Sequence, residues 1–434
     1  MIGSLDSSHD PGLKSWVESA NDPHSDFPIQ NLPLGRFRSS EGIRIGVAIG
    51  DQLLDLGEAA RSGLLDFPPE LLAGSTLVPL HDIRGSLRRS LSELLRAESA
   101  GLKGRLEPAL RPREAVEMLL PFEVGDYTDF YASVFHATNV GSMFRPDNPL
   151  LPNYKYVPVA YHGRASTLVV SGTPIRRPCG QVKPDDAKAP VREPSRLLDY
   201  ELEIGLFVGK GNPMGEVIPL DHAEAHLFGV CLVNDWSARD IQKWEYQPLG
   251  PFLAKSFATS LSPWVVTLEA LAPFRCPAYA RPEGDPAPLP YLDSQDDRAR
   301  GGIELTLEVL LQTRAMREQG IEPVRISRGS FRSMYWTAAQ MVAHHASNGC
   351  SLRPGDLLAS GTVSGPEPES RGCLLELSWD GPGRPRRPLQ LPSGEKRVFL
   401  QDGDEVILRG CCEREGCRRI GLGQCRGIVL PAAL

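Results

Sequence analysis

Residues 198–207 alternate strictly between apolar and mostly acidic side chains, and this run constrains the fold more than any other. Side chains two apart share one face of a β-strand, so the run predicts a half-buried strand with one apolar face. The opposite face carries Asp199, Glu201 and Glu203. Three acids in a row repel one another unless water or a cation neutralises them, and carboxylate oxygens suit Mg²⁺ or Ca²⁺. Taken alone, the run favours a solvated sheet face over a cation site.

The rest of the sequence predicts a mainly β (α+β) fold. Residues 303–309 alternate in the same way, and residues 374–379 are typical of a short strand. The chain has 42 glycines and 39 prolines among 434 residues, whereas an average protein carries about 12% of the two together. This excess is typical of many turns and opposes a helical bundle. Helices are favoured for residues 235–246 and 335–346, and a doubly wound sheet is disfavoured because regular βαβ alternation is missing.

The length of 434 residues predicts two to three domains, at about 150 residues each. Residues 45–56 predict a β-hairpin that turns at Gly50, and residues 84–101 carry apolar side chains at helical spacing. A basic, proline-containing stretch follows at 102–113, which places a domain boundary near residue 119. The predicted parts are a polar extension with little structure (1–25), a small N-terminal domain (26–118) and a larger C-terminal domain (119–434).

Charge and hydropathy exclude several classes of protein. The net charge is −7, whereas a general nucleic-acid binder needs a concentrated basic face. The sequence has no apolar run long enough to cross a membrane, and its start lacks the basic and apolar regions of a secretion signal. We therefore expect a cytoplasmic protein without a membrane or nucleic-acid partner. The nine cysteines lack the paired spacing of a zinc site, which favours reduced, mostly buried thiols.

Several polar residues are candidates for catalysis, although each also has an ordinary structural explanation. Asp235, Arg239 and Gln242 are spaced to share one face of a helix, but Asp235 is equally suited to cap that helix. Lys255 lies in an apolar, proline-rich loop, where a lysine either reaches solvent or stabilises an anion. His136 lies among aromatic residues and is either a general base or a buried structural histidine.

Four longer motifs carry a resemblance to a known family. They cover residues 125–131, 161–166, 234–242 and 355–362. With them the chain from 26 to 425, apart from stretches near 57–118, 275–300 and 310–325, resembles the fumarylacetoacetase family. The resemblance implies an N-terminal SH3-like barrel, a C-terminal mixed β-roll of the fumarylacetoacetase type that carries the active site, and a homodimer. It also implies metal-dependent hydrolysis of a carbon–carbon bond in a small β-diketone, 4-fumarylacetoacetate. The implied products are fumarate and acetoacetate, in the final step of tyrosine and phenylalanine catabolism.

The resemblance also implies roles for individual residues. It places the metal ligands at Asp129, Glu201, Glu203 and Asp235, with Lys255 and Thr259 beside the cation. It implies a catalytic dyad of His136 and Glu376, with an anion stabilised by Lys255, Arg239 and Gln242. The implied substrate contacts are Tyr131, Arg145, Arg239, Gln242, Tyr246 and Thr362. Mg²⁺ and Ca²⁺ both accept this ligand set, so the choice between them stays open. From its spacing alone, Asp129 cannot be separated from a turn residue.

Some positions and functions stay open at this point. Four residues depart from the family's pattern without removing a functional group: Val134, Phe135, Ala254 and Ala258. Shorter acylpyruvate hydrolases, decarboxylases and isomerases of the wider superfamily lack the N-terminal module, so residues 26–118 oppose these alternatives. An inactive oligomerising scaffold would have lost some of the acids, the histidine or the lysine, and all of them are present.

Overall fold

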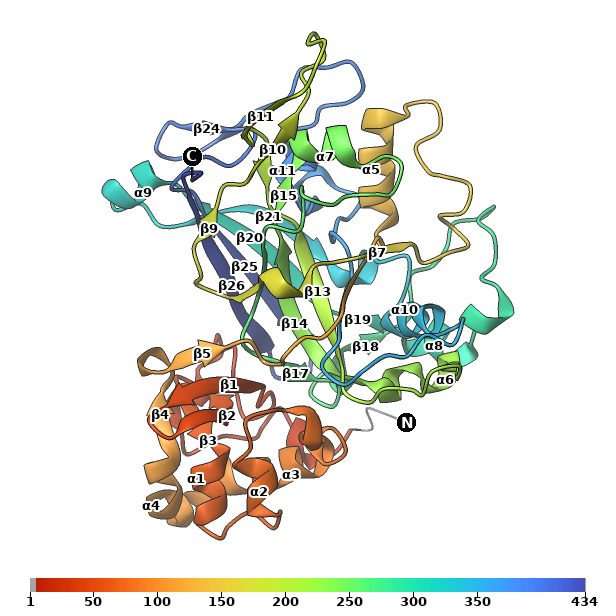
Figure 1. Cartoon of the computed structure of the whole chain (residues 1–434). Helices are drawn as coiled ribbons and strands as arrows, with labels where there is room; N and C mark the ends of the chain where they lie inside the picture. The colour runs from red at the N-terminus through yellow and green to blue at the C-terminus, as the bar shows by residue number, and fades with distance from the viewer. Residues whose placement is uncertain (1–4, 434) are drawn as a thin grey trace.

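The computed structural model describes residues 5–433, so residues 1–4 of the predicted extension lie outside the described part of the chain. Figure 1 shows a small N-terminal part, coloured red to orange, below a larger C-terminal part. The small part is an antiparallel sheet in the order β4 (Leu110–Pro112), β3 (Gln52–Asp55), β2 (Gly42–Ile49), β1 (Leu34–Ser39) and β5 (Glu117–Leu119). Its helices are α1 (Leu56–Arg61), α2 (Pro69–Leu72), α3 (Arg84–Leu95) and α4 (Lys103–Leu106).

The predicted hairpin is confirmed. Strand β2 pairs with β3, and Gly50 in the turn has a φ of +57°, a conformation that favours glycine. A Cβ atom on Gly50 would lie 2.3 Å from Ser19 Oγ and 2.5 Å from the backbone nitrogen of Ala20, so the N-terminal segment packs closely on this turn. The expectation that this segment has little structure is therefore only partly right. Its regular elements are two short 3-10 helices, Ser7–His9 and Glu18–Asn21.

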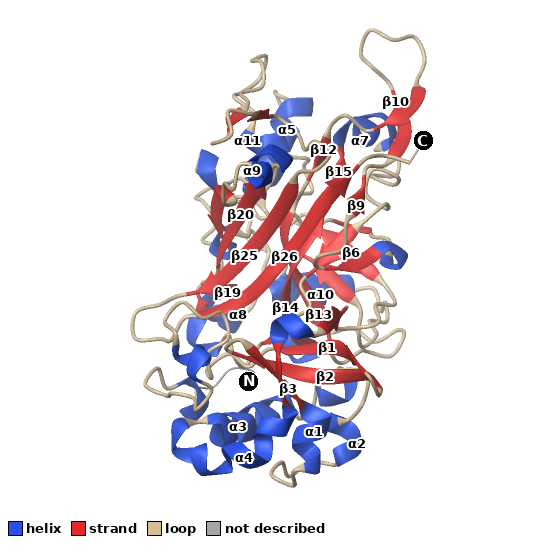
Figure 2. Cartoon of the chain, turned by 90° about the vertical axis from the view of Figure 1, so that its left-hand side faces the viewer, coloured by secondary structure: helices blue, strands red, loops and turns tan. Residues whose placement is uncertain are grey.

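The larger part contains two sheets that pack against each other (Figure 2). The first has the order β7 (Ala160–His162), β6 (Tyr127–Phe130), β22 (Leu357–Ala359), β13 (Leu202–Val208), β14 (Leu227–Asp235), β16 (Thr259–Leu261) and β8 (Leu168–Val170), and β17 (Val266–Thr267) pairs with β14. The second has the order β21 (Val324–Ser330), β20 (Thr306–Gln312), β25 (Glu405–Cys412), β26 (Ile420–Leu430) and β9 (Ile175–Arg176).

Short elements surround these two sheets. The helices are α5 (Val134–Phe144), α6 (Leu220–Ala223), α7 (Arg239–Glu245), α8 (Gln295–Arg300), α9 (Arg314–Glu318), α10 (Ala338–His345) and α11 (Leu374–Leu377). The two-stranded pairs are β10 (Cys179–Val182) with β11 (Val191–Pro194), β12 (Leu198–Asp199) with β15 (Ser237–Ala238), β18 (Arg275–Cys276) with β19 (Gly302–Ile303), and β23 (Leu389–Gln390) with β24 (Lys396–Arg397). Strands therefore dominate, as the mainly β prediction requires.

The prediction of a half-buried strand at 198–207 is wrong in two respects. The run is divided into β12 and β13, and every residue from 198 to 208 is buried, including all three acids. Leu202 and Ile204 face the core between the two sheets. The opposite face is covered as well, because the ring of Phe207 packs against Phe122 with the centroids 4.6 Å apart. The alternation thus identified the acidic face but not the layer that covers it.

Two further segments differ from their predicted local structure. Asp235 does not begin a helix, because it is the last residue of β14 and the helix starts at Arg239. Residues 374–379 do not form a strand, because residues 374–377 are the helix α11. A single helical turn is too short to show helical periodicity in a sequence. The predicted helix at 335–346 is confirmed as α10, which begins with a reciprocal capping box between Thr337 and Gln340.

The two parts of the chain share one apolar cluster. Phe122, on the connection between them, is 1% exposed and lies 4.6 Å from the Phe207 ring and 5.2 Å from the Phe228 ring. Backbone hydrogen bonds join Leu34 to Val265 in both directions, at 3.0 and 2.8 Å. The two parts of the chain therefore share a continuous hydrophobic core.

We expect Phe122→Ala to lower the free energy of unfolding by about 3–5 kcal/mol, because it leaves a cavity among buried rings. Chemical denaturation followed by tryptophan fluorescence measures this change. The matched control is Phe252→Ala, because Phe252 is 67% exposed and its removal should change stability by less than about 0.5 kcal/mol. Equal unfolding midpoints for the two variants would contradict the prediction.

Candidate active site

Four carboxylates meet at one end of the first sheet. Asp129 lies on β6, Glu203 on β13 and Asp235 at the end of β14, while Glu201 directly precedes β13. One oxygen of each lies within 4.8 Å of an oxygen of every other, and all four side chains are buried. The antiparallel pairing of β13 with β14 places Asp235 beside Glu201. The backbone nitrogen of Asp235 lies 3.3 Å from the backbone carbonyl oxygen of Glu201. The sheet therefore assembles acids that are more than 100 residues apart in the sequence.

This acidic cluster lacks donors for part of its oxygens. Asp129 Oδ1 and both carboxylate oxygens of Glu203 have no hydrogen-bond partner within residues 5–433. Burial, followed by the charge of Asp235, raises the pKa of Asp129 to about 8. Burial and the charges of Asp129 and Asp235 raise the pKa of Glu203 well above its usual value. Buried oxygens without donors are costly, and a hard divalent cation bound by carboxylates would remove that cost.

One lysine and two hydroxyl groups donate hydrogen bonds to the other acids of the cluster. Lys255 Nζ donates to Asp235 Oδ2 at 2.7 Å and to Glu201 Oε2, and Thr259 Oγ1 donates to Asp235 Oδ1 at 2.6 Å. The Tyr161 hydroxyl donates to Asp235 Oδ2 at 2.9 Å. Burial alone would lower the pKa of Lys255, but the charges of Asp235 and Glu201 raise it. The lysine is therefore a buried cation paired with the acids, and not a side chain that reaches solvent.

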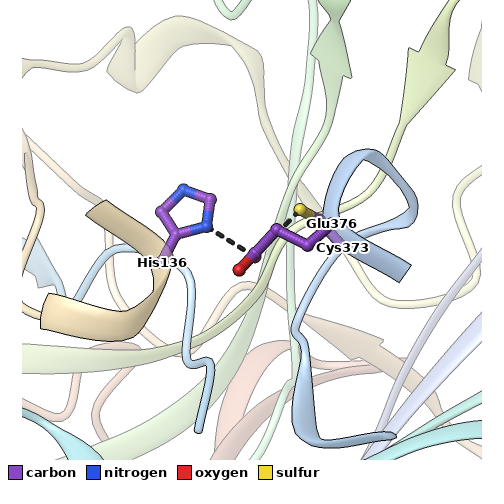
Figure 3. Close-up of side chains that lie close together, drawn as sticks. All are labelled: His136, Cys373 and Glu376. Carbon is purple, nitrogen blue, oxygen red and sulfur yellow. Dashed lines mark hydrogen bonds and ion pairs between the residues drawn. The ribbon is translucent and has the colours of Figure 1, made fainter. Parts of the chain in front are cut away.

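A histidine and a glutamate form a second centre (Figure 3). His136 lies on α5 and Glu376 on α11, and His136 Nδ1 is 2.6 Å from Glu376 Oε2. Asn139 Nδ2 donates to Glu376 Oε1 and Ser364 Oγ donates to Glu376 Oε2, both at 2.7 Å. The Cys373 thiol lies 3.2 Å from the same carboxylate.

The environment of Glu376 decides the tautomer of the histidine. Burial alone would raise the pKa of Glu376, but the charge of His136 and the hydrogen bonds lower it to about 2. Glu376 is therefore ionised and accepts the proton on His136 Nδ1. The other ring nitrogen, Nε2, is then free to act as a base.

Arg239 connects the two centres. Its Nε atom donates to Asp199 Oδ2 at 3.0 Å, and its Nη1 atom lies 2.8 Å from Glu201 Oε1 and 3.1 Å from Gln242 Oε1. Its Nη2 atom is buried and has no partner within the described residues. The described residues therefore use neither of the two N–H groups on Nη2.

A cavity of about 440 Å³ opens onto both centres. It is lined by Asp129 and Glu201 of the acidic cluster, by His136 and by Lys255. It is also lined by all six predicted substrate contacts: Tyr131, Arg145, Arg239, Gln242, Tyr246 and Thr362. The remaining predicted residues lie behind its wall: Glu203, Asp235, Thr259 and Glu376. The structure thus brings every predicted site residue to this cavity or directly behind it.

The sequence predicted no role for several supporting residues. Asp199 was identified as one of three acids on a strand face, but without a role of its own. Tyr161 was within reach, because it begins one of the four motifs. Asn139 follows His136 by three residues on a helix that was not predicted. Ser364 offered no local signal, because only the tertiary fold places it beside Glu376.

The structure shows the surroundings of three of the four departures from the family pattern. Neither Ala254 nor Ala258 has a positive φ, so neither position requires glycine, and both alanines are buried. The ring of Phe135 packs against Tyr279, with the centroids 6.0 Å apart.

All nine cysteines are free thiols. Within the described residues, the helices are too short or too polar to cross a membrane.

Comparisons with known proteins agree over nearly the whole chain. The family model for the fumarylacetoacetase N-terminal domain matches residues 30–121, and that for the fumarylacetoacetate (FAA) hydrolase C-terminal domain matches residues 127–430. The chain is 51% identical to the fumarylacetoacetase of Bos taurus, over 96% of this chain and 99% of that protein. It is 50% identical to the Homo sapiens fumarylacetoacetase (97% and 99% covered) and 45% identical to that of Arabidopsis thaliana (97% and 99% covered).

A solved structure supports the fold. The fumarylacetoacetate hydrolase from the psychrophilic Exiguobacterium antarcticum matches with a TM-score of 0.51, over 92% of this chain and 99% of that chain. The two sequences are 18% identical, so this likeness concerns the fold alone. The family models and the curated relatives above lead to one conclusion: the chain belongs to the fumarylacetoacetase family.

Proposed function

We propose that this chain hydrolyses 4-fumarylacetoacetate to fumarate and acetoacetate, the last step of tyrosine and phenylalanine catabolism. The observation that carries the proposal is the single cavity onto which both the acidic cluster and the His136–Glu376 pair open. Relatives named fumarylacetoacetase, at 45–51% identity over nearly the full length, support the same activity.

We propose Mg²⁺ or Ca²⁺ as the cation, with Asp129, Glu201, Glu203 and Asp235 as ligands, because the donor-poor oxygens of this cluster fit a hard cation. Such a cation, when bound, supplies Lewis acidity that polarises the diketone and stabilises the departing enolate. Thr259 donates to one oxygen of Asp235 and Lys255 to the other, which fixes the orientation of this carboxylate within the cluster.

His136 and Glu376 have separate roles in the proposed reaction. His136 Nε2 takes a proton from water, and the resulting hydroxide attacks the carbonyl beside the fumaryl double bond. Glu376 holds the ring and stabilises the imidazolium that forms. The bond to the acetoacetate carbon then breaks, and that carbon receives a proton from the imidazolium, so the proton balance closes.

Other side chains bind the substrate and its developing charge. The free Nη2–H group of Arg239, with Gln242 and Lys255 nearby, is suited to stabilise the oxyanion. Arg145 offers a planar fork for a substrate carboxylate. Tyr131, Tyr246 and Thr362 complete the proposed contacts, and the Thr362 hydroxyl has no hydrogen-bond partner within residues 5–433.

We further propose a cytoplasmic homodimer whose N-terminal domain, residues 26–118, is structural and shields the core. The family resemblance supports the homodimer, and the structural role is supported by the lining of the cavity, which contains no residue of 26–118. Sedimentation of the purified chain tests the oligomeric state, and fractionation of the source cells tests the location.

A product assay with fumarylacetoacetate tests the proposed function. We expect loss of the substrate absorbance with equal amounts of fumarate and acetoacetate formed, and inhibition by a chelator. Acylpyruvate and oxaloacetate are the comparison substrates, because they represent the shorter members of the superfamily. Faster turnover of either one than of fumarylacetoacetate would contradict the proposal.

We expect Glu376→Gln to lower kcat by about 10- to 100-fold, less than removal of the histidine itself. The amide still holds the ring, but it cannot balance the charge of the imidazolium. Steady-state kinetics measures the effect. Glu369→Gln is the control, because Glu369 is an exposed glutamate on a neighbouring turn. Equal kcat values in both variants would exclude a role for the Glu376 charge.

A further inference from the structure

Asp199 is a buried carboxylate that the roles above leave without a function. It is 0% exposed, and its two oxygens accept four N–H groups. Oδ1 accepts from the backbone nitrogens of Tyr200 at 2.9 Å and Leu374 at 2.8 Å. Oδ2 accepts from the backbone nitrogen of Leu375 at 3.0 Å and from Arg239 Nε at 3.0 Å. One side chain thus joins α7 to α11, segments more than 130 residues apart.

On the α7 side, Asp199 determines how Arg239 faces the cavity. Asp199 holds Nε, and Glu201 holds Nη1 at 2.8 Å. With these two nitrogens fixed, the planar guanidinium has one orientation, in which the buried Nη2 has no hydrogen-bond partner among the described residues. Arg239 itself lines the cavity. Loss of the Nε contact would free this group to rotate.

On the α11 side, Asp199 determines where Glu376 lies. Helix α11 has four residues, and Cys373 at its N-cap position makes no side-chain capping bond. Asp199 accepts the first two N–H groups of the helix instead. A helix of one turn is not stable by itself, so such tertiary contacts fix its place. Glu376 is its third residue and contacts His136 at 2.6 Å.

We propose that Asp199 is a positioning residue, which holds Arg239 and the helix of Glu376 in one frame so that the anion-stabilising donor and the general base face the same carbonyl. This inference rests on the proposed hydrolysis. The role requires a carboxylate, because asparagine has one acceptor oxygen and would turn its own N–H₂ group toward two of the four donors.

The test compares Asp199→Asn and Asp199→Ser with a matched control. Asp55 has the same kind of network in the N-terminal part: it caps α1 through Gly57 and Glu58, and Arg44 Nη2 donates to it at 2.9 Å. Both Asp199 variants should lower kcat about 10- to 100-fold with KM changed less than about threefold, because misorientation affects the transition state most. Asp55→Asn should leave kcat per folded protein unchanged.

Two further measurements separate positioning from a general structural role. The loss of kcat in the double variant Asp199→Asn, Glu376→Gln should be smaller than the product of the single losses, because both act through the same histidine. Without substrate, the downfield proton NMR signal of His136 Nδ1–H should move or disappear in Asp199→Asn and persist in Asp55→Asn.

The outcomes decide the inference and the proposed function separately. A wild-type chain that does not hydrolyse fumarylacetoacetate overturns the proposed function, and the NMR comparison still decides the role of Asp199. An unchanged NMR signal, a kcat within about twofold of wild type, or fully multiplicative losses overturn the inference. It is equally overturned if neither Asp199 variant folds, because Asp199 is then a structural residue.

Discussion

Removal of all divalent cations is expected to reduce turnover of fumarylacetoacetate by about a thousandfold or more, because the Lewis acid contributes several kcal/mol to the transition state. The acidic cluster leaves Asp129 Oδ1 and both oxygens of Glu203 without donors in residues 5–433. Lys255 is already paired with Asp235 and Glu201 and does not replace the cation. Chelation, gel filtration and re-titration with Mg²⁺ or Ca²⁺ measure the loss and its reversal.

Substitution of a single proposed metal ligand tests the requirement for a cation in a second way. Glu201→Gln and Asp235→Asn should lose bound metal, measured by elemental analysis, and lose activity in parallel. Asp221→Asn is the control, since Asp221 is exposed and does not line the cavity. Full activity in protein shown to be free of metal would refute the requirement for a cation.

His136→Ala is expected to lower kcat by about 10²- to 10⁴-fold, the usual contribution of a general base. The imidazole lies beside a carboxylate whose pKa is about 2 and which therefore fixes the proton on Nδ1. No other titratable ring nitrogen lines the cavity among the described residues. The cation content should stay unchanged, because no imidazole nitrogen belongs to the acidic cluster.

The comparison for His136→Ala is His222→Ala, an exposed histidine on α6 that does not line the cavity. Its kcat should equal that of the wild type. The assignment of His136 as the base fails if His136→Ala keeps a near wild-type kcat. It also fails if activity is lost only in proportion to lost metal.

Local patterns in the sequence predicted the elements whose structure depends on near neighbours. The hairpin at 45–56 was predicted from its glycine turn, and the structure also confirms the helix predicted at 335–346. Alternation along 198–207 identified Glu201 and Glu203 as members of one strand face. These predictions succeed because a turn is formed by a few consecutive residues, and because the side-chain patterns of helices and strands repeat within two to four residues.

The roles of some proposed site residues could not be predicted from residue spacing and were predicted only from the longer family motifs. Asp129 is indistinguishable from a turn residue in its own segment, and Lys255 from a lysine that reaches solvent. Both were assigned through the family resemblance. In the structure Asp129 lies in the acidic cluster, and Lys255 pairs with two of its acids.

Only the tertiary structure decided which residues meet and which of them are buried. His136 and Glu376 are 240 residues apart, and the helix that carries Glu376 is fixed by Asp199, 175 residues from Leu374. The acid face of β13 is buried because other layers of the protein cover it, which alternation cannot reveal. The sequence by itself determined which groups are available: four carboxylates, a histidine, an arginine and a lysine. Their charge states and orientations depend on burial and on distant hydrogen bonds, and both are properties of the folded chain.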